Sequence, residues 1–316
     1  MRRRKRIRQF FESGVACAAG LLVPLLPRRL VVMLARVLGV LAFRLNRRDR
    51  RTAEANLRIA FGDSLDESRR DAIILGSFHT FALLLLDLFW FSRHTAKRVA
   101  AHFRTDETWA YYAETTPLIA VTGHLGNWEL LGLATAAAGY PLTSVAMPLQ
   151  NARADAMVNR AREATGMRVV PRRGAVRALL KELRRGGRVA LLMDQNTLPE
   201  EGGAFRPFFG LPAPVSEAVG GLWQRTHAKV LFGWCIPDAS GVYHAHAEPP
   251  FPDSPNTSAA DVTAQLVACQ EETIRRFPEH WLWSYRRWRY VPEGEDASQY
   301  PFYAIPYINT KKEGVT

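Results

Sequence analysis

Beyond Pro117, short apolar runs alternate along the chain with amphipathic stretches of helical period. Apolar runs of about four to eight residues favour strands, whereas apolar positions that repeat every three or four residues favour helices. The expected strands are Leu118–Thr122, Thr143–Met147, Met167–Val170, Arg188–Met193, Lys229–Ile236 and Val242–Ala247. The expected helices are Trp128–Ala138, Ala152–Thr165, Gly174–Arg185, Ser216–Thr226 and Ala259–Phe277. This alternation predicts an α/β fold, in which helices flank a mixed, largely parallel sheet.

The segment from Asp49 to about Phe91 has a helical pattern. Asp66-Glu67-Ser68 opens its second half, because an acidic residue can cap a helix N-terminus. From Phe78 to Phe91 the helix is apolar nearly all round. We therefore expect this part to be buried in protein or in lipid.

The N-terminal region contains two further apolar stretches. Ser13–Pro27 has 15 residues without a charge, and Leu30–Phe43 is interrupted by Arg36. A membrane-spanning helix needs about 20 apolar residues, and a signal peptide needs a cleavage site of small residues, which is not evident before Arg28. We expect an N-terminal hydrophobic anchor helix that lies in the cytoplasmic leaflet. The expected domains are residues 1–48 (basic membrane anchor), 49–290 (α/β domain) and 291–316 (C-terminal tail).

The charge distribution supports a membrane partner. The chain of 316 residues has 42 Lys and Arg against 30 Asp and Glu, and the whole surplus of +12 lies in residues 1–51. A nucleic-acid-binding protein usually carries its basic surface on the folded domain. A surplus beside apolar segments instead suits anionic lipid headgroups. A basic tail that is simply solvated is the alternative.

The overall composition excludes several classes of protein. Hydrophobic residues make up 47% and charged residues 23%, which is globular usage and excludes a disordered or polytopic membrane chain. Cys17, Cys235 and Cys269 lie far apart. They have no metal-ligand spacing and do not form an even disulfide set, so we expect a reducing, cytosol-facing body.

The most informative motif is GHLGNWE, Gly123–Glu129, directly after a predicted strand. Asn127 is a good N-cap for a helix beginning at Trp128, which places His124 on a loop at the carboxyl edge of the sheet. The turn would let Glu129 fold back toward the imidazole. A histidine held by a carboxylate can take a proton from a hydroxyl, and N–H groups at the helix start can stabilise an oxyanion. His124 and Glu129 are therefore the candidate catalytic pair.

The same spacing occurs at His102 and Glu107, where it follows no strand and has no glycine beside it. We interpret that copy as a solvated helix start without a catalytic role.

Three further segments could contact a substrate. Arg153–Arg188 holds 11 basic residues against three acidic ones, and arginine suits phosphate, although a solvated basic face is the simpler reading. The strand 188–193 leads into Asp194, Gln195 and Asn196, where an aspartate can also merely cap a loop. The glycine-punctuated stretch 202–210 contains Phe208 and Phe209 and could be a core loop or a wall of an acyl-chain pocket.

Pro278–Trp288 (PEHWLWSYRRW) combines three tryptophans, a tyrosine and two arginines in 11 residues. Such a mixture is typical of a membrane interface, where aromatic rings lie at headgroup depth. A base-stacking platform for single-stranded nucleic acid is the competing interpretation, and no RNA-binding motif accompanies it.

Taken in order, these segments resemble the bacterial lipid A biosynthesis acyltransferases of the lauroyl/myristoyl (HtrB/MsbB) type, within the lysophospholipid acyltransferase superfamily. The resemblance extends over nearly the whole chain and includes Asn151, Asp155, Arg162 and Gly166. It implies that His124 and Glu129 are the catalytic HX4(D/E) pair and that Arg162 is the functional arginine. Asn127, Arg162, Asp194, Gln195, Phe208 and Phe209 are the expected substrate-binding residues. Tyr285 stands where many members have a histidine.

The resemblance implies a layered glycerolipid-acyltransferase-like domain that transfers a fatty acyl chain from acyl carrier protein to a hydroxyl of a lipid A precursor. The expected location is the cytoplasmic face of the bacterial inner membrane. Neither a metal nor a cofactor is expected beyond the acyl-carrier thioester, and the expected partners are acyl carrier protein, the lipid acceptor and the membrane surface, without nucleic acid. Two alternatives remain. One is an acyltransferase for another lyso-lipid or hydroxylated acceptor, and the other is a non-enzymatic basic membrane or nucleic-acid binder, favoured if His124 and Glu129 lie far apart.

Overall fold

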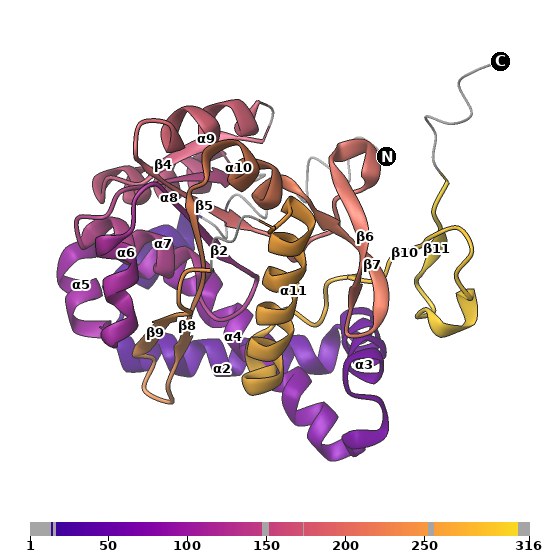
Figure 1. Ribbon diagram of the computed structural model, residues 1–316. Helices are drawn as coiled ribbons and strands as arrows, with labels where there is room; N and C mark the ends of the chain where they lie inside the picture. The colour runs from indigo at the N-terminus through magenta and orange to yellow at the C-terminus, as the bar shows by residue number, and fades with distance from the viewer. Residues whose placement is uncertain (1–13, 15–16, 147–151, 173, 252–255, 309–316) are drawn as a thin grey trace.

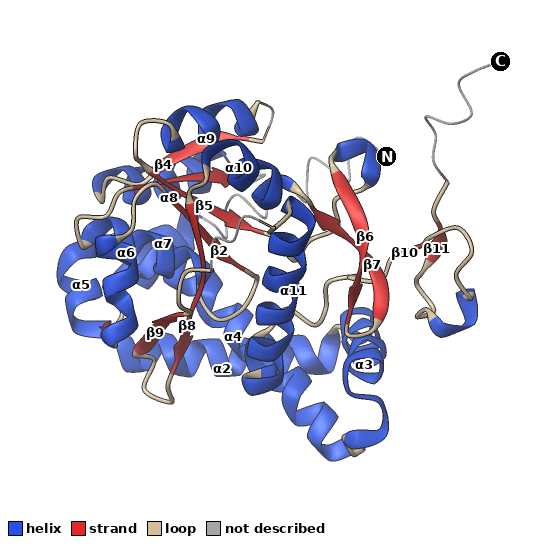
Figure 2. Ribbon diagram, viewed as in Figure 1, coloured by secondary structure: helices blue, strands red, loops and turns tan. Residues whose placement is uncertain are grey.

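The structure, a computed structural model, describes residues 14, 17–146, 152–172, 174–251 and 256–308. Its centre is a seven-stranded sheet with the order β1-β9-β8-β2-β5-β3-β4. Neighbouring strands are parallel except β8 and β9, which are antiparallel. Helices lie on both sides of this sheet (Figure 1 and Figure 2). The prediction of a mixed, largely parallel sheet flanked by helices is confirmed.

The strands of the central sheet are β1 (Phe103–Thr105), β2 (Leu118–Thr122), β3 (Leu142–Ala146), β4 (Arg168–Pro171), β5 (Arg188–Leu192), β8 (Lys229–Pro237) and β9 (Tyr243–Ala247). All but β1, which was not predicted, agree closely with the strands predicted from the apolar runs. Two small sheets lie outside it. They are the antiparallel hairpin of β6 (Gly203–Phe208) and β7 (Leu211–Ser216), and the short parallel pair of β10 (Tyr290–Val291) and β11 (Ile305–Pro306).

The helices are α2 (Arg28–Leu45), α3 (Arg47–Phe61), α4 (Glu67–Trp90), α5 (Thr95–His102), α6 (Ala110–Glu114), α7 (Trp128–Ala137), α8 (Ala152–Ala164), α9 (Ala175–Leu183), α10 (Ala218–Thr226) and α11 (Ala259–Arg276). Helices α7 to α11 begin and end close to the predicted positions, and α3 and α4 occupy the segment predicted as helical, whereas α5 and α6 were not predicted. Asp66 caps α4 by accepting a hydrogen bond from the Arg69 N–H, as its sequence position predicts. The Pro-rich hairpin β6–β7 was not predicted, because its prolines and glycines read as a loop.

Side-chain alternation along β2 separates two halves of the core. Ile119 and Val121 point into a cluster that includes residues of α9, α10 and α11. Leu118 and Ala120 point the opposite way and pack with Tyr112 of α6. This second face, covered by α6 and α7, is where the sheet borders the site described below.

The apolar helix α4 is part of the protein core. Among the described residues it is the helix long and apolar enough to cross a membrane, with a mean hydropathy of 2.0. Its residues Ile73, Leu83 and Trp90 are nevertheless buried within the body. Of the two environments expected for Phe78–Phe91, protein or lipid, the surrounding protein therefore covers a large part.

The helix α2 packs against α4 and presents its other side to solvent. Val31 and Ala35 are buried, whereas Leu41 and Leu45 are 46% and 77% exposed. Arg28, at the start of α2, forms a buried ion pair with Asp87 of α4. Residues 28–45 thus belong to the same folded body as the sheet while keeping an exposed apolar face.

Candidate functional site

The loop between β2 and α7 is a tight turn that glycine makes possible. Gly126 has φ +61°, and a Cβ there would lie 2.0 Å from the carbonyl oxygen of Cys235. The side chain of Asn127 then caps α7 by accepting a hydrogen bond from the Leu130 N–H at 2.9 Å. These two residues fix the direction of the loop and leave His124 at the carboxyl edge of the sheet, as predicted.

Asn127 is buried and has its hydrogen bonds satisfied within the protein. Its amide nitrogen donates to the Tyr243 hydroxyl at 3.2 Å and lies 3.5 Å from Asp87. The Tyr243 hydroxyl donates to the same Asp87 carboxylate at 2.7 Å. The expectation that Asn127 binds substrate is corrected: with 1% of its surface exposed, it shapes the turn.

The imidazole of His124 is held by Asp194. Nδ1 of His124 lies 2.7 Å from Oδ1 of Asp194, and the His124 backbone N–H donates to Oδ2 at 2.7 Å. The indole N–H of Trp281 also donates to Oδ2, at 3.0 Å. Because a carboxylate only accepts hydrogen bonds, Nδ1 carries the proton and Nε2 presents its lone pair.

Asp194 is ionised in this arrangement. Burial alone would raise its pKa, but the nearby His124 and the hydrogen bonds from His124 and Trp281 outweigh burial and lower the pKa below its usual value. The Asp194 side chain is 2% exposed and that of His124 is 17% exposed. A buried carboxylate therefore orients a histidine that the solvent can still reach.

The sheet register explains why these two residues meet. β2 and β5 are parallel neighbours, and Thr122 pairs with Leu192. His124 and Asp194 each follow the last paired residue by two positions, so both emerge at the same point of the carboxyl edge. The sequence placed Asp194 among the substrate-binding residues, and its role beside His124 was missed although both strands had been predicted.

Gln195 lies on the solvent side of the imidazole. Its amide nitrogen is 3.1 Å from Nε2 of His124 and donates to the lone pair there. Gln195 is exposed, so its side chain can leave when another donor, such as a substrate hydroxyl, approaches Nε2.

Glu129 contacts Arg162 instead of His124. Nε and Nη2 of Arg162 donate to Oε2 of Glu129 at 3.1 and 2.6 Å, and Nη1 donates to Asn159 at 2.9 Å. Within the described ranges, the polar partners of the His124 ring are Asp194 and Gln195. The expectation that Glu129 folds back to the imidazole is thus corrected, because the second residue of α7 points toward α8.

The same contacts revise the expected role of Arg162. Its side chain is 11% exposed and its guanidinium is committed to Glu129 and Asn159. Direct phosphate binding by Arg162 would require this ion pair to open.

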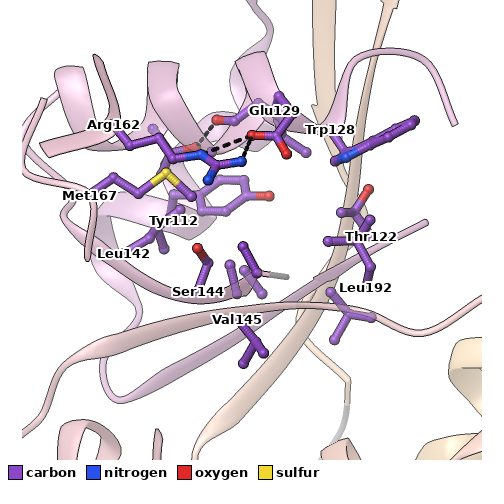
Figure 3. Close-up of a pocket in the computed structure, with 17 residues that line it drawn as sticks. Tyr112, Thr122, Trp128, Glu129, Leu142, Ser144, Val145, Arg162, Met167 and Leu192 are labelled. Atoms are coloured by element: carbon purple, nitrogen blue, oxygen red, sulfur yellow. Dashed lines mark hydrogen bonds and ion pairs between the residues drawn. The ribbon is translucent and has the colours of Figure 1, made fainter. Parts of the chain in front are cut away.

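An apolar pocket lies between α7 and the sheet, beside His124. Its empty volume is about 540 Å³ including the open mouth. The lining includes Thr122, Trp128, Leu131, Gly132, Leu142, Ser144, Val145, Met167 and Leu192. Figure 3 shows Glu129 and Arg162 together at one side of this pocket, and Thr122 and Trp128 at another. Since the Trp128 ring lies 4.5 Å from the His124 ring, the pocket begins next to the imidazole.

Phe208 and Phe209 belong to the core. Phe208 is fully buried against Trp281 and Trp288, with ring centroids 5.8 and 5.6 Å away. Phe209 packs against Phe61, and neither phenylalanine lines the apolar pocket. Of the two interpretations of this stretch, burial in the core is right, although Phe208 ends the strand β6 and does not belong to a loop. The expectation that these residues bind substrate is corrected.

The aromatic segment 281–288 also supports the site from inside the protein. Trp281, Trp283 and Trp288 are at most 1% exposed, so the expectation of a membrane interface here was wrong. The Tyr285 hydroxyl accepts a hydrogen bond from the Asn196 N–H at 2.8 Å, and Arg287 donates to the Asn196 side chain at 2.7 Å. Together with the Trp281 bond, these contacts hold the Asp194–Asn196 loop in place.

The second copy of the His-x4-Glu spacing has different surroundings. His102 is the last residue of α5, and its ring packs 5.1 Å from that of Trp90. It is therefore half-buried and not the solvated helix start that we expected. Asn151 lies outside the described residues, and among those described no group of three or more His, Cys, Asp or Glu side chains is placed to hold a metal ion.

Three comparisons relate the chain to known proteins. None of the curated proteins is significantly similar in sequence. Among solved structures, the crystal structure of PlsC, the 1-acyl-sn-glycerophosphate (LPA) acyltransferase of Thermotoga maritima, is similar with 11% sequence identity and a TM-score of 0.38, over 79% of this chain and 98% of that chain. The family model described as bacterial lipid A biosynthesis acyltransferase matches residues 4–290. The protein therefore belongs to the bacterial lipid A biosynthesis acyltransferase family, and it is an acyltransferase.

Proposed function

We propose that this protein transfers a fatty acyl chain from an acyl carrier protein thioester to a hydroxyl of a lipid A precursor, at the cytoplasmic face of the inner membrane. The observation that carries the proposal is the His124–Asp194 pair, whose imidazole packs against Trp128 in the wall of an apolar pocket, in a chain of this family. The pair supplies a base, and the pocket suits a hydrocarbon chain.

His124 acts as the general base. The acceptor hydroxyl replaces Gln195 at Nε2 and gives its proton to the imidazole while its oxygen attacks the thioester carbonyl. Asp194 stabilises the imidazolium that forms, as the buried aspartate does in Ser-His-Asp enzymes. When the tetrahedral intermediate collapses, the C–S bond breaks and the imidazolium returns the proton to the thiolate, so the base is regenerated.

The start of α7 provides the stabilisation of the developing oxyanion. The first N–H groups of a helix have no partner within the helix, and they carry the positive end of its dipole. The α7 N-terminus begins at Trp128, four residues after His124. The thioester oxygen is best placed there, with the acyl chain directed into the apolar pocket.

Glu129 and Arg162 position the substrate by closing one side of the pocket. Their ion pair is mostly shielded from solvent, with side-chain exposures of 25% and 11%. We assign Glu129 to the integrity of the pocket wall rather than to direct proton transfer. The Glu129 carboxylate is then still necessary for activity, because it maintains the shape of the pocket.

The test of the proposed function is mass spectrometry of membrane lipids from cells with and without the gene. The expected difference is one fatty acyl group on the lipid A fraction, restored by the intact gene and not by a gene carrying His124→Ala. A change in another lipid class, with lipid A unaltered, would favour the alternative of an acyltransferase for a different hydroxylated acceptor.

A further inference from the structure

A second, polar cleft includes Asn196, two residues after Asp194, in its lining. Its empty volume is about 870 Å³ including the open mouth. The lining consists of Arg48, Asp49, Asn196, Leu198, Glu201, Ser284, Tyr285, Arg286, Arg289 and Tyr290. None of these residues lines the apolar pocket. The two spaces therefore offer separate places for an apolar and a polar ligand.

The cleft carries an excess of unpaired positive charge. No ion pair joins Arg48, Arg286 or Arg289 to a carboxylate within the part of the chain that the structure describes. Its two acidic residues are already engaged, because Asp49 accepts a hydrogen bond from Asn46 and Glu201 pairs with Arg172 at 2.9 Å.

Two of these arginines are held in place by aromatic rings. The Arg286 guanidinium lies 5.5 Å from the centroid of Tyr303, and that of Arg289 lies 5.3 Å from the centroid of Tyr290. Such cation–π contacts hold the planar groups while their N–H donors stay free. The cleft is thus ready to receive an anion that can accept several hydrogen bonds.

The cleft is connected to the reactive nitrogen of the histidine through the loop that carries Gln195 and Asn196. Asn196 and Tyr285 both line the cleft and are joined by a hydrogen bond of 2.8 Å. Gln195, next in the chain to Asn196, is the residue that contacts Nε2 of His124. The apolar pocket reaches the same histidine through Trp128. The base is thus in contact with Trp128, which lines the apolar space, and with Gln195, which precedes a residue of the cationic one.

We infer that this arginine cleft binds a phosphate group on the headgroup of the lipid acceptor. The inference rests on the proposed function and adds the anionic part of the substrate to it. Guanidinium groups bind phosphate oxygens in pairs and retain their charge at all relevant pH values. A phosphate held there places a neighbouring sugar hydroxyl toward Nε2.

The position of Arg48 favours the lipid over the carrier protein as the source of this phosphate. Arg48 is the second residue of α3 and follows Leu45, which ends the exposed apolar face of α2. A lipid whose chains lie along that face would bring its headgroup directly to the cleft. The phosphate of a carrier prosthetic group would arrive from solvent and would not need the apolar face.

The test compares Arg286→Gln/Arg289→Gln with the control Arg47→Gln/Arg225→Gln, which removes the same charge from exposed arginines that do not line the cleft. The probes are a phosphorylated acylated glucosamine disaccharide in detergent micelles and the same lipid without its phosphates. Binding is measured without acyl donor, and circular dichroism checks the fold. We expect wild type and control to prefer the phosphorylated lipid at least about 10-fold, and the cleft variant to lose this preference.

Kinetics give a second readout. With the phosphorylated acceptor, KM should rise about 10-fold or more in the cleft variant, with the KM for the acyl carrier protein unchanged. A rise confined to the carrier KM would assign the phosphate to the donor and overturn the inference. An undiminished preference in the cleft variant, or no preference in the wild type, would also overturn it. If the wild type prefers the phosphorylated lipid but transfers no acyl chain to it, the proposed function is refuted and the inference about the cleft stands.

Discussion

At the scale of single residues, the proposed chemistry depends on how Asp194 holds His124. Replacing Asp194 by Asn keeps the shape but removes the charge that stabilises an imidazolium. We expect kcat to fall about 10²–10⁴-fold, because the imidazolium that forms during proton transfer loses its counter-charge. Steady-state rates of acyl transfer for the folded variant and the wild type check this effect.

The matched control is another His–Asp pair with the same distance between nitrogen and oxygen. His246 Nδ1 lies 2.7 Å from Asp106 Oδ2 on the protein surface, away from the site. Asp106→Asn should leave kcat within about threefold, since exposed pairs contribute little. Equal losses in the two variants would mean that Asp194 acts only on stability.

The sequence predicted His124 but not its partner. The position of His124, after a strand and before a capped helix, could be predicted from Gly126 and Asn127 alone. The partner required the strand order, because Asp194 is 70 residues away and becomes adjacent only when β2 and β5 pair. The spacing of Glu129 pointed to a local contact, whereas the rigid helix directs that side chain to Arg162.

At the scale of elements, the turn before α7 requires glycine at one position. Gly126→Ala would place a methyl group 2.0 Å from the Cys235 carbonyl oxygen, at φ +61°. We expect a loss of at least about 2 kcal/mol in the free energy of unfolding, and loss of turnover. Urea denaturation measures the first and the acyl-transfer assay the second.

Gly139 is the control for this substitution. It also has a positive φ, +92°, but no atom lies within 4 Å of the position that a Cβ would take. Gly139→Ala should therefore cost only about 1–2 kcal/mol of backbone strain and keep its activity. Similar turnover in the two variants would show that the turn geometry does not govern catalysis.

His280, in the 3-10 turn before Trp281, makes the free energy of unfolding depend on pH. Burial lowers the pKa of His280 to about 4, whereas an unfolded histidine titrates near 6.5. Between these values the unfolded chain binds a proton that the folded chain does not, so the stability falls as the pH is lowered. From pH 7 to pH 5 this contribution amounts to about 2 kcal/mol.

His280→Gln removes that titration and keeps a polar group near Thr80, which lies 2.8 Å from Nδ1. Between pH 7 and pH 5, the free energy of unfolding measured in urea should decrease about 2 kcal/mol less in the variant than in the wild type. The same pH dependence in both proteins would contradict the assignment.

Most helices and strands could be predicted from the sequence, because the spacing of apolar residues along the chain reflects which face of each element is buried. It did not distinguish a buried aromatic cluster from a membrane belt at 281–288, since both need tryptophan and arginine. Burial of Trp281, Trp283 and Trp288 depends on the β6–β7 hairpin and α3 closing over them, which no local pattern reveals.

At the scale of the whole molecule, α2 links its exposed apolar face, which we propose contacts the membrane, to the site. Its inner side is tied by Arg28 to Asp87, which also bonds Tyr243 beside Asn127. Removing α2 would leave a charge buried without its partner, so a truncation would disturb the fold as well as membrane binding. A substitution on the exposed face of α2 tests the membrane role without this damage.

Leu45 is 77% exposed at the end of α2, and Val176 is 48% exposed on α9. Leu45→Glu should weaken binding to vesicles containing phosphatidylglycerol at least about 10-fold, because an apolar contact with lipid is lost and a negative charge is added. Val176→Glu adds the same charge and should change binding less than about threefold. Vesicle sedimentation gives both values, and equal effects would place the membrane contact elsewhere.

The central claim is that His124 is the base of an acyl transfer. The most direct measurement is a time course of acyl transfer from acyl carrier protein to a purified lipid A precursor, followed by mass spectrometry. Wild type should add one acyl chain, folded His124→Ala should be about 10²–10⁴-fold slower, and His102→Ala, which has the same His-x4-Glu spacing, should stay within about threefold. Near-normal transfer by folded His124→Ala would contradict the claim.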